Sequence, residues 1–346
     1  MNGIQIRKME KEEAELVWKI GRQSFGFVEG LAFQKPQNAF LAIIDNKIAG
    51  MASYKLFPAK NNQKIGYVET CFVKKEYAGK GVGTQLYQKA TQFLKEQGCE
   101  TAAATVKDDN VASWKLFENN GYHITGYMQM LKHYGFTGTI RLWFQSTLAI
   151  ATGFDIWTTI PVKRSSVSMQ IVLFALLNLL ILLPSLLFGG GITDLGVKAA
   201  AVTVLLASSL AGGLLYVLLS REKWHFRVTR GGLLISVLVT GLGGYWPMAG
   251  RFYPEKYQRT SKFSRSMGLE GLFEWLAILL LVGAGAAWQD QSVFWQEVCA
   301  LGTTLLLLHS LPMYPFACFG GNRIWEYSKI LSVGTMIISG VGIFVL

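Results

Sequence analysis

The stretch KEYAGKGVGTQLYQKATQFLKEQG, residues 75–98, places three glycines within five positions at the start of an amphipathic helix. Gly79, Gly81 and Gly83 can adopt positive φ and let a ligand approach the backbone, so consecutive N–H groups can point into one concavity. The N-terminus of the helix adds a dipole that favours a pyrophosphate. The stretch therefore predicts a phosphate-binding turn, with a glycine-rich loop that binds nothing as the alternative.

Two other nucleotide-binding motifs do not fit this turn. The glycines are spaced G-x-G-x-G, whereas a dinucleotide fingerprint needs G-x-G-x-x-G and an acidic residue after a second parallel strand. A P-loop needs G-K-[ST] after four spacer residues, and the stretch lacks it. The sequence thus argues against both classes.

The segments around the turn follow strand and helix patterns in alternation. Residues 45–47, Asp-Asn-Lys, predict a hairpin turn, and Asn110 predicts the N-cap of a helix that ends at Asn119-Asn120-Gly121. We expect strands at 4–9, 38–44, 48–57, 65–75, 100–107 and 123–134, and helices at 10–25, directly after the glycines, and at 110–122. This order predicts a mixed α/β domain.

Three of these segments resemble motifs A and B of the GNAT N-acetyltransferase superfamily: the strand YVETCFV (67–73), the turn AGKGVG (78–83) and the helix NVASWKLFENNGY (110–122). The resemblance covers about residues 3–133 and implies an α/β GNAT fold, with a mixed, mostly antiparallel sheet and flanking helices. It implies acetyl-CoA as the cosubstrate, with its pyrophosphate on the backbone of Gly79, Lys80, Gly81, Val82, Gly83 and Thr84. It also pairs the strand edge at Phe72 and Val73 with the pantetheine arm, and places Asn110 and Ser113 near the thioester.

The chain departs from the family pattern at two positions. Ala78 stands where the family usually has Arg or Gln, so one phosphate-directed side chain is missing; Lys75 or Lys80 could supply charge nearby. Phe117 stands where a tyrosine often serves as general acid, and losing such an acid costs roughly 10²–10⁴-fold in rate. Glu69 lies where several relatives place a general base, with a solvated strand glutamate as the alternative.

The second half of the chain predicts a polytopic, all-α membrane domain at 167–346, after a linker or interfacial segment at 141–166. Five apolar runs are long enough to span a bilayer, at about 167–188, 199–219, 270–288, 298–316 and 330–346. A sixth stretch, 231–249, is broken by glycines and a proline, and basic runs flank it on both sides. It therefore predicts a re-entrant segment.

The distribution of Lys and Arg predicts the orientation. With five spans, 13 of the 14 basic residues from 163 onward fall on one side of the membrane, the exception being Lys198. The N-terminus has no apolar signal region, so residues 1–140 are expected on the cytoplasmic side, where acetyl-CoA is available. We expect Glu270 and Glu274, near a cytoplasmic helix end, to pair with Arg265 or Lys262.

A second resemblance concerns residues 196–329. The segment LHSLPMYPFACFGGNRIWEYSK (308–329) is similar to the N-x-x-P-x-x-P…D-G segment of site-2-protease-type intramembrane metalloproteases. The helix that should carry H-E-x-x-H reads VLLASSLAGGLLYVLL (204–219), with neither His nor Glu. The resemblance implies a protease-like scaffold without catalytic zinc, and we expect no metal.

Composition limits the other classes. The net charge of +11 arises largely from loops that flank apolar runs, and no helix carries a basic stripe, so we expect no nucleic-acid partner. The four cysteines are scattered, which argues against a disulfide framework or a zinc knuckle. The sequence predicts an integral membrane N-acetyltransferase whose acceptor is an amine of a peptide, a membrane protein or a small metabolite. The alternative is a non-catalytic acyl-CoA-sensing regulator or scaffold.

Overall fold

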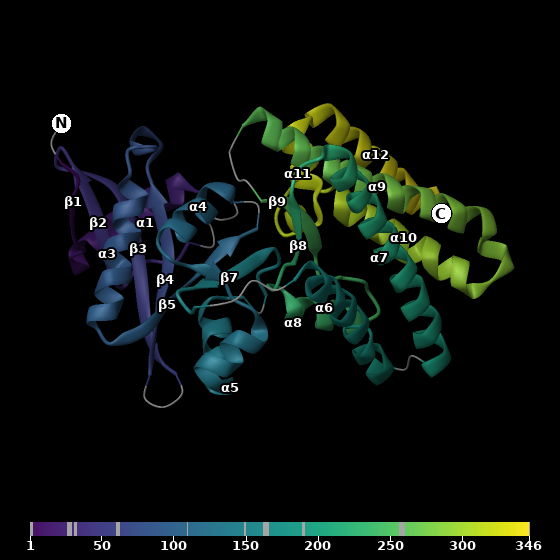
Figure 1. The fold of residues 1–346 in the computed structure, drawn as a ribbon, viewed down its shortest axis with the longest axis horizontal. Helices are drawn as coiled ribbons and strands as arrows, with labels where there is room; N and C mark the ends of the chain where they lie inside the picture. The colour runs from purple at the N-terminus through teal and green to yellow at the C-terminus, as the bar shows by residue number, and fades with distance from the viewer. Residues whose placement is uncertain are drawn as a thin grey trace. The chain divides into compact units, whose positions relative to one another are not determined.

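The computed structural model describes residues 3–25, 30, 33–59, 63–108, 110–148, 150–161, 166–188, 191–255 and 260–345 (Figure 1). Contacts divide the chain into two compact units. Unit 1 comprises Met1–Val106, Ala112–Thr147 and Asp155–Lys163, and unit 2 comprises Lys107–Val111, Leu148–Phe154 and Arg164–Leu346. The short segment Lys107–Val111, which follows a strand of unit 1, thus packs within unit 2.

Unit 1 is built on a seven-stranded sheet with the order β1-β2-β3-β4-β5-β7-β6. The strands are β1 (Gln5–Lys8), β2 (Ala39–Ile44), β3 (Lys47–Pro58), β4 (Lys64–Val73), β5 (Cys99–Lys107), β6 (His123–Ile124) and β7 (Phe154–Thr158). Strands β1 to β4 pair antiparallel, β4 and β5 pair parallel, and β6 and β7 pair antiparallel. The predicted mixed, mostly antiparallel sheet is confirmed.

Helices α1 (Ala14–Ser24) and α3 (Val82–Glu96) cover opposite faces of this sheet (Figure 1). Successive residues of β2 point to opposite faces because strand side chains alternate. Leu41 therefore packs in a core with Val17 of α1, whereas Phe40 lies 5.4 Å, ring to ring, from Phe93 of α3. Each such fully buried side chain contributes about 1.5–3 kcal/mol. These two cores hold β4 and the turn that follows it in place.

The strand predicted at 123–134 is wrong beyond Ile124. Gly126 interrupts it and becomes the N-cap of α5 (Tyr127–Gln145), where its N–H donates to Gln129 Oε1 at 2.8 Å. The helix is kinked at Gly135, and buried residues lie four positions apart on each side of the kink, Met130 and Tyr134 before it and Gly138 and Leu142 after it. The alternation at 123–126 was too short to define a longer strand.

The segment 141–166, predicted as a linker or interfacial segment, contains regular structure. Its first residues complete α5, and Phe154–Thr158 form β7, which lies between β5 and β6 in the sheet. The Thr125 N–H donates to the carbonyl of Ile156 at 3.0 Å, and the Thr159 N–H donates to the carbonyl of Ala102 at 2.9 Å. The basic pair Lys163 and Arg164 lies outside the described residues.

Unit 2 is mainly helical, but it is not all-α as predicted. Its helices are α6 (Val167–Leu180), α7 (Ile192–Ser220), α8 (Leu233–Gly241), α9 (Ser261–Trp288), α10 (Val293–Ser310), α11 (Gly321–Tyr327) and α12 (Lys329–Val345). The short helical turns η4 (Leu183–Phe188), η5 (Gln289–Gln291) and η6 (Phe316–Phe319) join some of them. Strands β8 (Trp224–Val228) and β9 (Gly250–Pro254) form an antiparallel pair.

This strand pair explains the stretch expected to be re-entrant. Val228 lies opposite Gly250, so the two ends of the intervening segment are adjacent. Within that segment α8 has only nine residues, about 14 Å at 1.5 Å per residue, which is too short to cross a bilayer. The prediction of an all-α domain is wrong because β8 and β9 are strands. Basic residues that flank 231–249 lie in these short segments, so the sequence showed no apolar pattern that would indicate a strand.

Three helical segments of the described chain are long and apolar enough to cross a membrane: Val167–Leu186, Thr193–Ser220 and Ser261–Gln291. They correspond to the first three predicted spans, although the first segment ends at Leu186, two residues earlier than predicted. The span predicted at 298–316 corresponds to α10, which ends at Ser310 because Pro312 and Pro315 cannot continue a helix. The span predicted at 330–346 corresponds to α12, a shorter apolar helix. The count of five is therefore not confirmed.

Unit 2 buries a network of opposite charges on α9. Arg251 of β9 pairs with Glu274 and lies 3.5 Å from Glu270, and Arg323 of α11 lies 2.5 Å from Glu270. All four side chains are buried. The partners expected from the sequence are wrong, since Lys262 instead pairs with Glu222 at 2.9 Å and Arg265 is exposed. β9 brings Arg251 to the glutamates from a distant part of the chain.

Candidate functional site

The glycine turn joins β4 to α3 through the helical turn η3 (Lys75–Tyr77). Gly79 and Gly81 have φ of 77° and 78°, the left-handed region in which a side chain is strained. A Cβ built at either position would meet no atom of the protein within 4 Å. The glycines are therefore required by backbone conformation, and the space above them is open to a ligand.

The N-terminus of α3 offers hydrogen-bond donors to that space. Gly81 is the N-cap and has no side chain to accept from the helix, and the first intrahelical bond runs from the Gln85 N–H to the Gly81 carbonyl at 3.1 Å. The N–H groups of Val82, Gly83 and Thr84 thus have no acceptor within the helix. Together with the helix dipole, they favour an anion such as a phosphate.

The last residues of β4 leave one backbone edge open. The described β4–β5 register runs from Lys64–Cys99 to Val68–Ala104, whereas on its other side β4 pairs with β3 as far as Val73. Within that described register, the part of β4 from residue 69 to 73 has no β5 partner. The Phe72 side chain is buried in the core beside α1, so its backbone alone is available at this edge. An extended ligand could pair there.

Glu69 lies at a bulge in β4. Ser53 lies opposite Thr70 and Tyr54 lies opposite Val68, which leaves Glu69 as the extra residue. A bulge redirects the side chain it carries and is frequent beside active sites. The carboxylate forms an ion pair with Lys55 and accepts from Ser53 Oγ at 3.4 Å. Glu69 is therefore not a freely solvated strand glutamate, which was the alternative interpretation.

The helix α4 (Val111–Asn119) carries the other predicted residues. Asn110 precedes the helix and is exposed, and its N–H donates to the Lys107 carbonyl at 3.1 Å; Ser113 is half-buried. Phe117 is 2% exposed and packs against Tyr87, with ring centroids 4.7 Å apart. Phe117 belongs to an aromatic core and has no proton to donate.

Sequence reasoning missed the two buried tyrosines, Tyr87 and Tyr122, whose rings pack against Phe117. Burial raises the pKa of Tyr87, so its phenol holds its proton more tightly than a solvated tyrosine does. Burial also raises the pKa of Tyr122 and of the Cys71 thiol, each to about 12, against a weaker opposing effect at Tyr122 from its hydrogen bond with Thr91. Tyr87 follows Leu86 in an apolar helical pattern, which in sequence indicates only core packing.

Sequence reasoning also missed how the segment before α4 is held. Within unit 2, the Tyr253 hydroxyl donates to Asp108 Oδ2 at 3.0 Å, and the Asp108 N–H donates to the Gly153 carbonyl at 2.8 Å. The guanidinium groups of Arg227 and Arg323 lie 4.1 and 4.4 Å from the Tyr253 ring centroid. The residues just before Asn110 are thus tied to the buried charges of unit 2.

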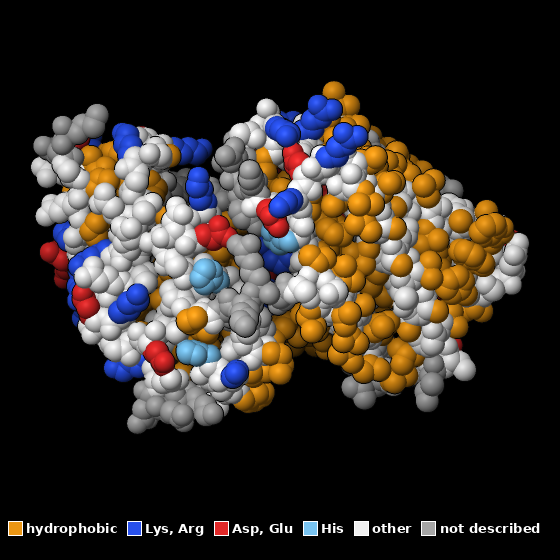
Figure 2. Space-filling model, in the orientation of Figure 1, with side chains coloured by type: hydrophobic (Ala, Val, Ile, Leu, Met, Phe, Trp, Pro, Cys, Tyr) orange, Lys and Arg blue, Asp and Glu red, His pale blue; other side chains and the backbone are white. Residues whose placement is uncertain are grey.

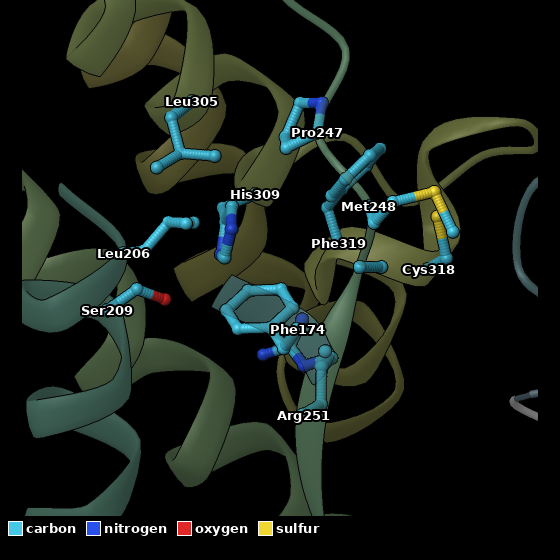
Figure 3. Close-up of a pocket in the computed structure, with 12 residues that line it drawn as sticks. Phe174, Leu206, Ser209, Pro247, Met248, Arg251, Leu305, His309, Cys318 and Phe319 are labelled. Atoms are coloured by element: carbon cyan, nitrogen blue, oxygen red, sulfur yellow. The ribbon is translucent and has the colours of Figure 1, made fainter. Parts of the chain in front are cut away.

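Unit 2 encloses a small cavity, but not one that could hold a substrate. Its lining comes from α6, α7, β9, α10 and η6 and includes Phe174, Ser209, Arg251 and His309 (Figure 3). Its volume is about 10 Å³, enough for about one water molecule. Among the described residues, no three His, Cys, Asp or Glu side chains are grouped as metal ligands would be.

Comparison with known proteins defines the class of unit 1. Residues 4–122 match the sequence model of the Acetyltransferase (GNAT) family, so this part of the chain is similar to GNAT acetyltransferases. The chain is similar to N-alpha-acetyltransferase 30 of Xenopus laevis, with 32% identity over 87 residues that cover 25% of this chain and 32% of the relative. It is also similar to N-alpha-acetyltransferase 30 of Schizosaccharomyces pombe, with 25% identity over 101 residues covering 29% and 66% of the two chains.

A GNAT-family acetyltransferase structure from Streptococcus pneumoniae shares 24% identity, covers 36% of this chain and 87% of its own, and has a TM-score of 0.30. This chain spans only about a third of the Xenopus relative. The similarities to curated relatives cover at most 29% of this chain.

Proposed function

We propose that this protein is a membrane-anchored N-acetyltransferase that transfers the acetyl group of acetyl-CoA to an amine at the cytoplasmic face of a membrane. The observation that carries the proposal is the open glycine turn at Gly79–Thr84, with unpaired donors at the start of α3, inside a GNAT domain. The membrane part rests on the three apolar helical segments of unit 2.

Acetyl-CoA would bind along β4 and the turn. The N–H groups of Val82, Gly83 and Thr84 would donate to the pyrophosphate, and the open edge at Phe72 and Val73 would pair with the pantetheine arm. Ala78 offers no phosphate ligand. Lys80 is exposed beside the turn, with its Nζ 5.2 Å from the Tyr77 ring centroid, and can supply positive charge.

The reaction needs an amine nucleophile and two proton movements. The amine nitrogen attacks the thioester carbon, the C–N bond forms, the C–S bond breaks, and CoA leaves as a thiolate that takes up a proton. We assign Glu69 as the base that receives the proton of the amine, from its place on the β4 bulge. The thiolate would take up its proton from solvent, because Phe117 cannot donate one.

We infer that the acceptor is the α-amine of a peptide or of a membrane protein. The support is the similarity to enzymes named N-alpha-acetyltransferase 30. A small amine metabolite is the alternative acceptor. The site residues Asn110 and Ser113, before and within α4, would lie near the thioester in either case.

Five spans, with α10 and α12 as the fourth and fifth, would place the basic loops and residues 1–140 together on the cytoplasmic side. The adjacency of β8 and β9 supports a segment 231–249 that enters and leaves on one face. A scaffold similar to site-2 proteases, without zinc, remains part of this proposal. Irregular backbone within the bilayer would be tolerated because the protein buries it.

A second candidate function is an acyl-CoA sensor without turnover. Phe117, which cannot donate a proton, and the ion pair of Glu69 with Lys55 favour it. Release of CoA thiol distinguishes the two functions. The full-length protein in detergent is incubated with acetyl-CoA and a panel of peptides and amines. Acceptor-dependent release supports the transferase, and tight binding without release across the panel supports the sensor.

A further inference from the structure

The helix α5 of unit 1 has an apolar outer face. It is kinked at Gly135, whose φ of 69° and ψ of 176° are not helical, and exposed apolar side chains lie on both sides of the kink: Met128, Phe136 and Phe144 are 76%, 74% and 65% exposed. Among the large hydrophobic side chains described in unit 1, these are the three most exposed. Figure 2 shows hydrophobic side chains gathered where Figure 1 places α5, beside a Lys or Arg side chain.

The inner face of the same helix is also apolar, since Met130, Tyr134 and Leu142 are buried in unit 1. A helix at the surface of a soluble domain carries polar residues on its outer face, whereas a helix that is apolar on both faces is covered on both. An aromatic side chain that is three-quarters exposed, such as Phe136, is therefore expected to be covered by something other than water.

We propose that the outer face of α5 lies in the interfacial region of an anionic lipid bilayer. Its charge fits that partner: residues 127–145 contain Lys132 and Arg141 and neither Asp nor Glu. Basic residues beside an apolar face let a helix insert Phe and Met side chains between lipids while the cations contact phosphate headgroups. Trp143, half-buried on the same helix, is of a type enriched at this depth.

The proposed membrane anchoring supports a lipid bilayer, rather than a second copy of the chain, as the partner that covers the outer face of α5. The first apolar segment of membrane length starts at Val167, with only 21 residues between it and the end of α5 at Gln145, so unit 1 is tethered at a bilayer surface. A second copy of the chain would have to meet a face whose charged groups are all basic. The inference rests on the proposed membrane association and not on acetyl transfer.

Photo-crosslinking tests the inference with the full-length protein. The photoreactive residue p-benzoylphenylalanine replaces Phe136 or Phe144 in protein reconstituted into vesicles of phosphatidylcholine and phosphatidylglycerol, and mass spectrometry identifies the adducts. Leu16 on α1, 54% exposed, is the matched control in unit 1, and Leu280 on α9, 75% exposed, is the control for membrane insertion.

Lipid adducts at 136 and 144, and none at 16, are expected. Adducts at 280 without adducts at 136 or 144 would overturn the inference while leaving the membrane anchor standing. No lipid adduct at 280 would instead contradict the anchor itself, and the inference with it. Adducts at 136 that join two chains, or that join α5 to unit 2, would also overturn it.

The charge of α5 gives a second readout. Lys132→Gln with Arg141→Gln should lower the lipid-adduct yield at position 136 in the phosphatidylglycerol vesicles and abolish their advantage over pure phosphatidylcholine. The expected loss is about fivefold for each basic residue, because one Lys or Arg near an anionic surface contributes roughly 1 kcal/mol. An unchanged yield in both lipids would contradict the charge argument.

Discussion

At the scale of single residues, Gly81 carries the most information. Its backbone is left-handed and the space around it is open. Its role in ligand binding can therefore be separated from its role in folding by comparison with a second glycine that has the same two properties. Gly121 has a φ of 76°, and a Cβ at that position would likewise meet nothing within 4 Å. Both glycines would suffer the same backbone strain on substitution, about 1–2 kcal/mol.

We predict that Gly81→Asp abolishes acetyl-CoA binding, because a carboxylate would repel the pyrophosphate at the helix N-terminus. Gly121→Asp should lose comparable stability and keep its affinity. Isothermal titration with acetyl-CoA and thermal melting measure the two effects. Equal affinity for both variants and the unchanged protein would remove the turn from the binding site.

Glu69 tests catalysis separately from binding. We predict that Glu69→Gln lowers turnover by about 10²–10⁴-fold, the usual effect of a general base, with acetyl-CoA affinity almost unchanged. Glu12→Gln, at an exposed position of unit 1, is the control. Steady-state thiol release gives the rates. Wild-type turnover in the Glu69 variant would leave the bulge glutamate with a structural role only.

At the scale of elements, the packing of β9 against α9 depends on charges that are buried together. Removing one member of a buried ion pair leaves an uncompensated charge and costs about 3–5 kcal/mol, whereas replacing both with apolar residues is often neutral. Arg251 pairs with Glu274, and both are buried, so this pair lends itself to a mutant cycle.

We predict that Arg251→Ala destabilises the protein by about 3–5 kcal/mol. The double variant Arg251→Met with Glu274→Leu should recover most of that loss. Arg265→Ala on the exposed side of α9 should change stability little. Thermal unfolding in detergent compares the variants. If Arg251→Ala and Arg265→Ala melt alike, the buried network contributes nothing to stability.

At the scale of the whole molecule, unit 1 is not contiguous in the chain. Its sheet includes β7, which lies after α5 and inserts between β5 and β6. We predict that a chain ending at residue 140 unfolds without cooperativity, whereas one ending at residue 161 melts cooperatively. Circular dichroism on heating compares them. Equally sharp transitions would show that β7 is dispensable for the fold of unit 1.

The sequence by itself determined the features that depend on local chemistry. The glycine turn, strands β1 to β5, the helices α1, α3 and α4, and the long apolar helices follow from conformational preference and periodicity, which neighbouring residues specify. The end of α4 at Asn119, with Gly121 at positive φ, is also local. These features were sufficient to predict a mixed α/β domain, and the resemblance of three of its segments to the GNAT superfamily implied the particular fold.

The tertiary structure decided the features that depend on distant partners. The bulge at Glu69 and its ion pair with Lys55 exist because β3 lies beside β4. Strand β7 has a short sequence with little alternation, and it forms because it pairs with β5 on one side and β6 on the other. Strands β8 and β9 pair with each other although a helix lies between them in the chain. Glu274 pairs with Arg251 rather than with Lys262 or Arg265, which are nearer in sequence, because the fold places Arg251 beside it in the buried interior. No local sequence pattern encodes that pairing.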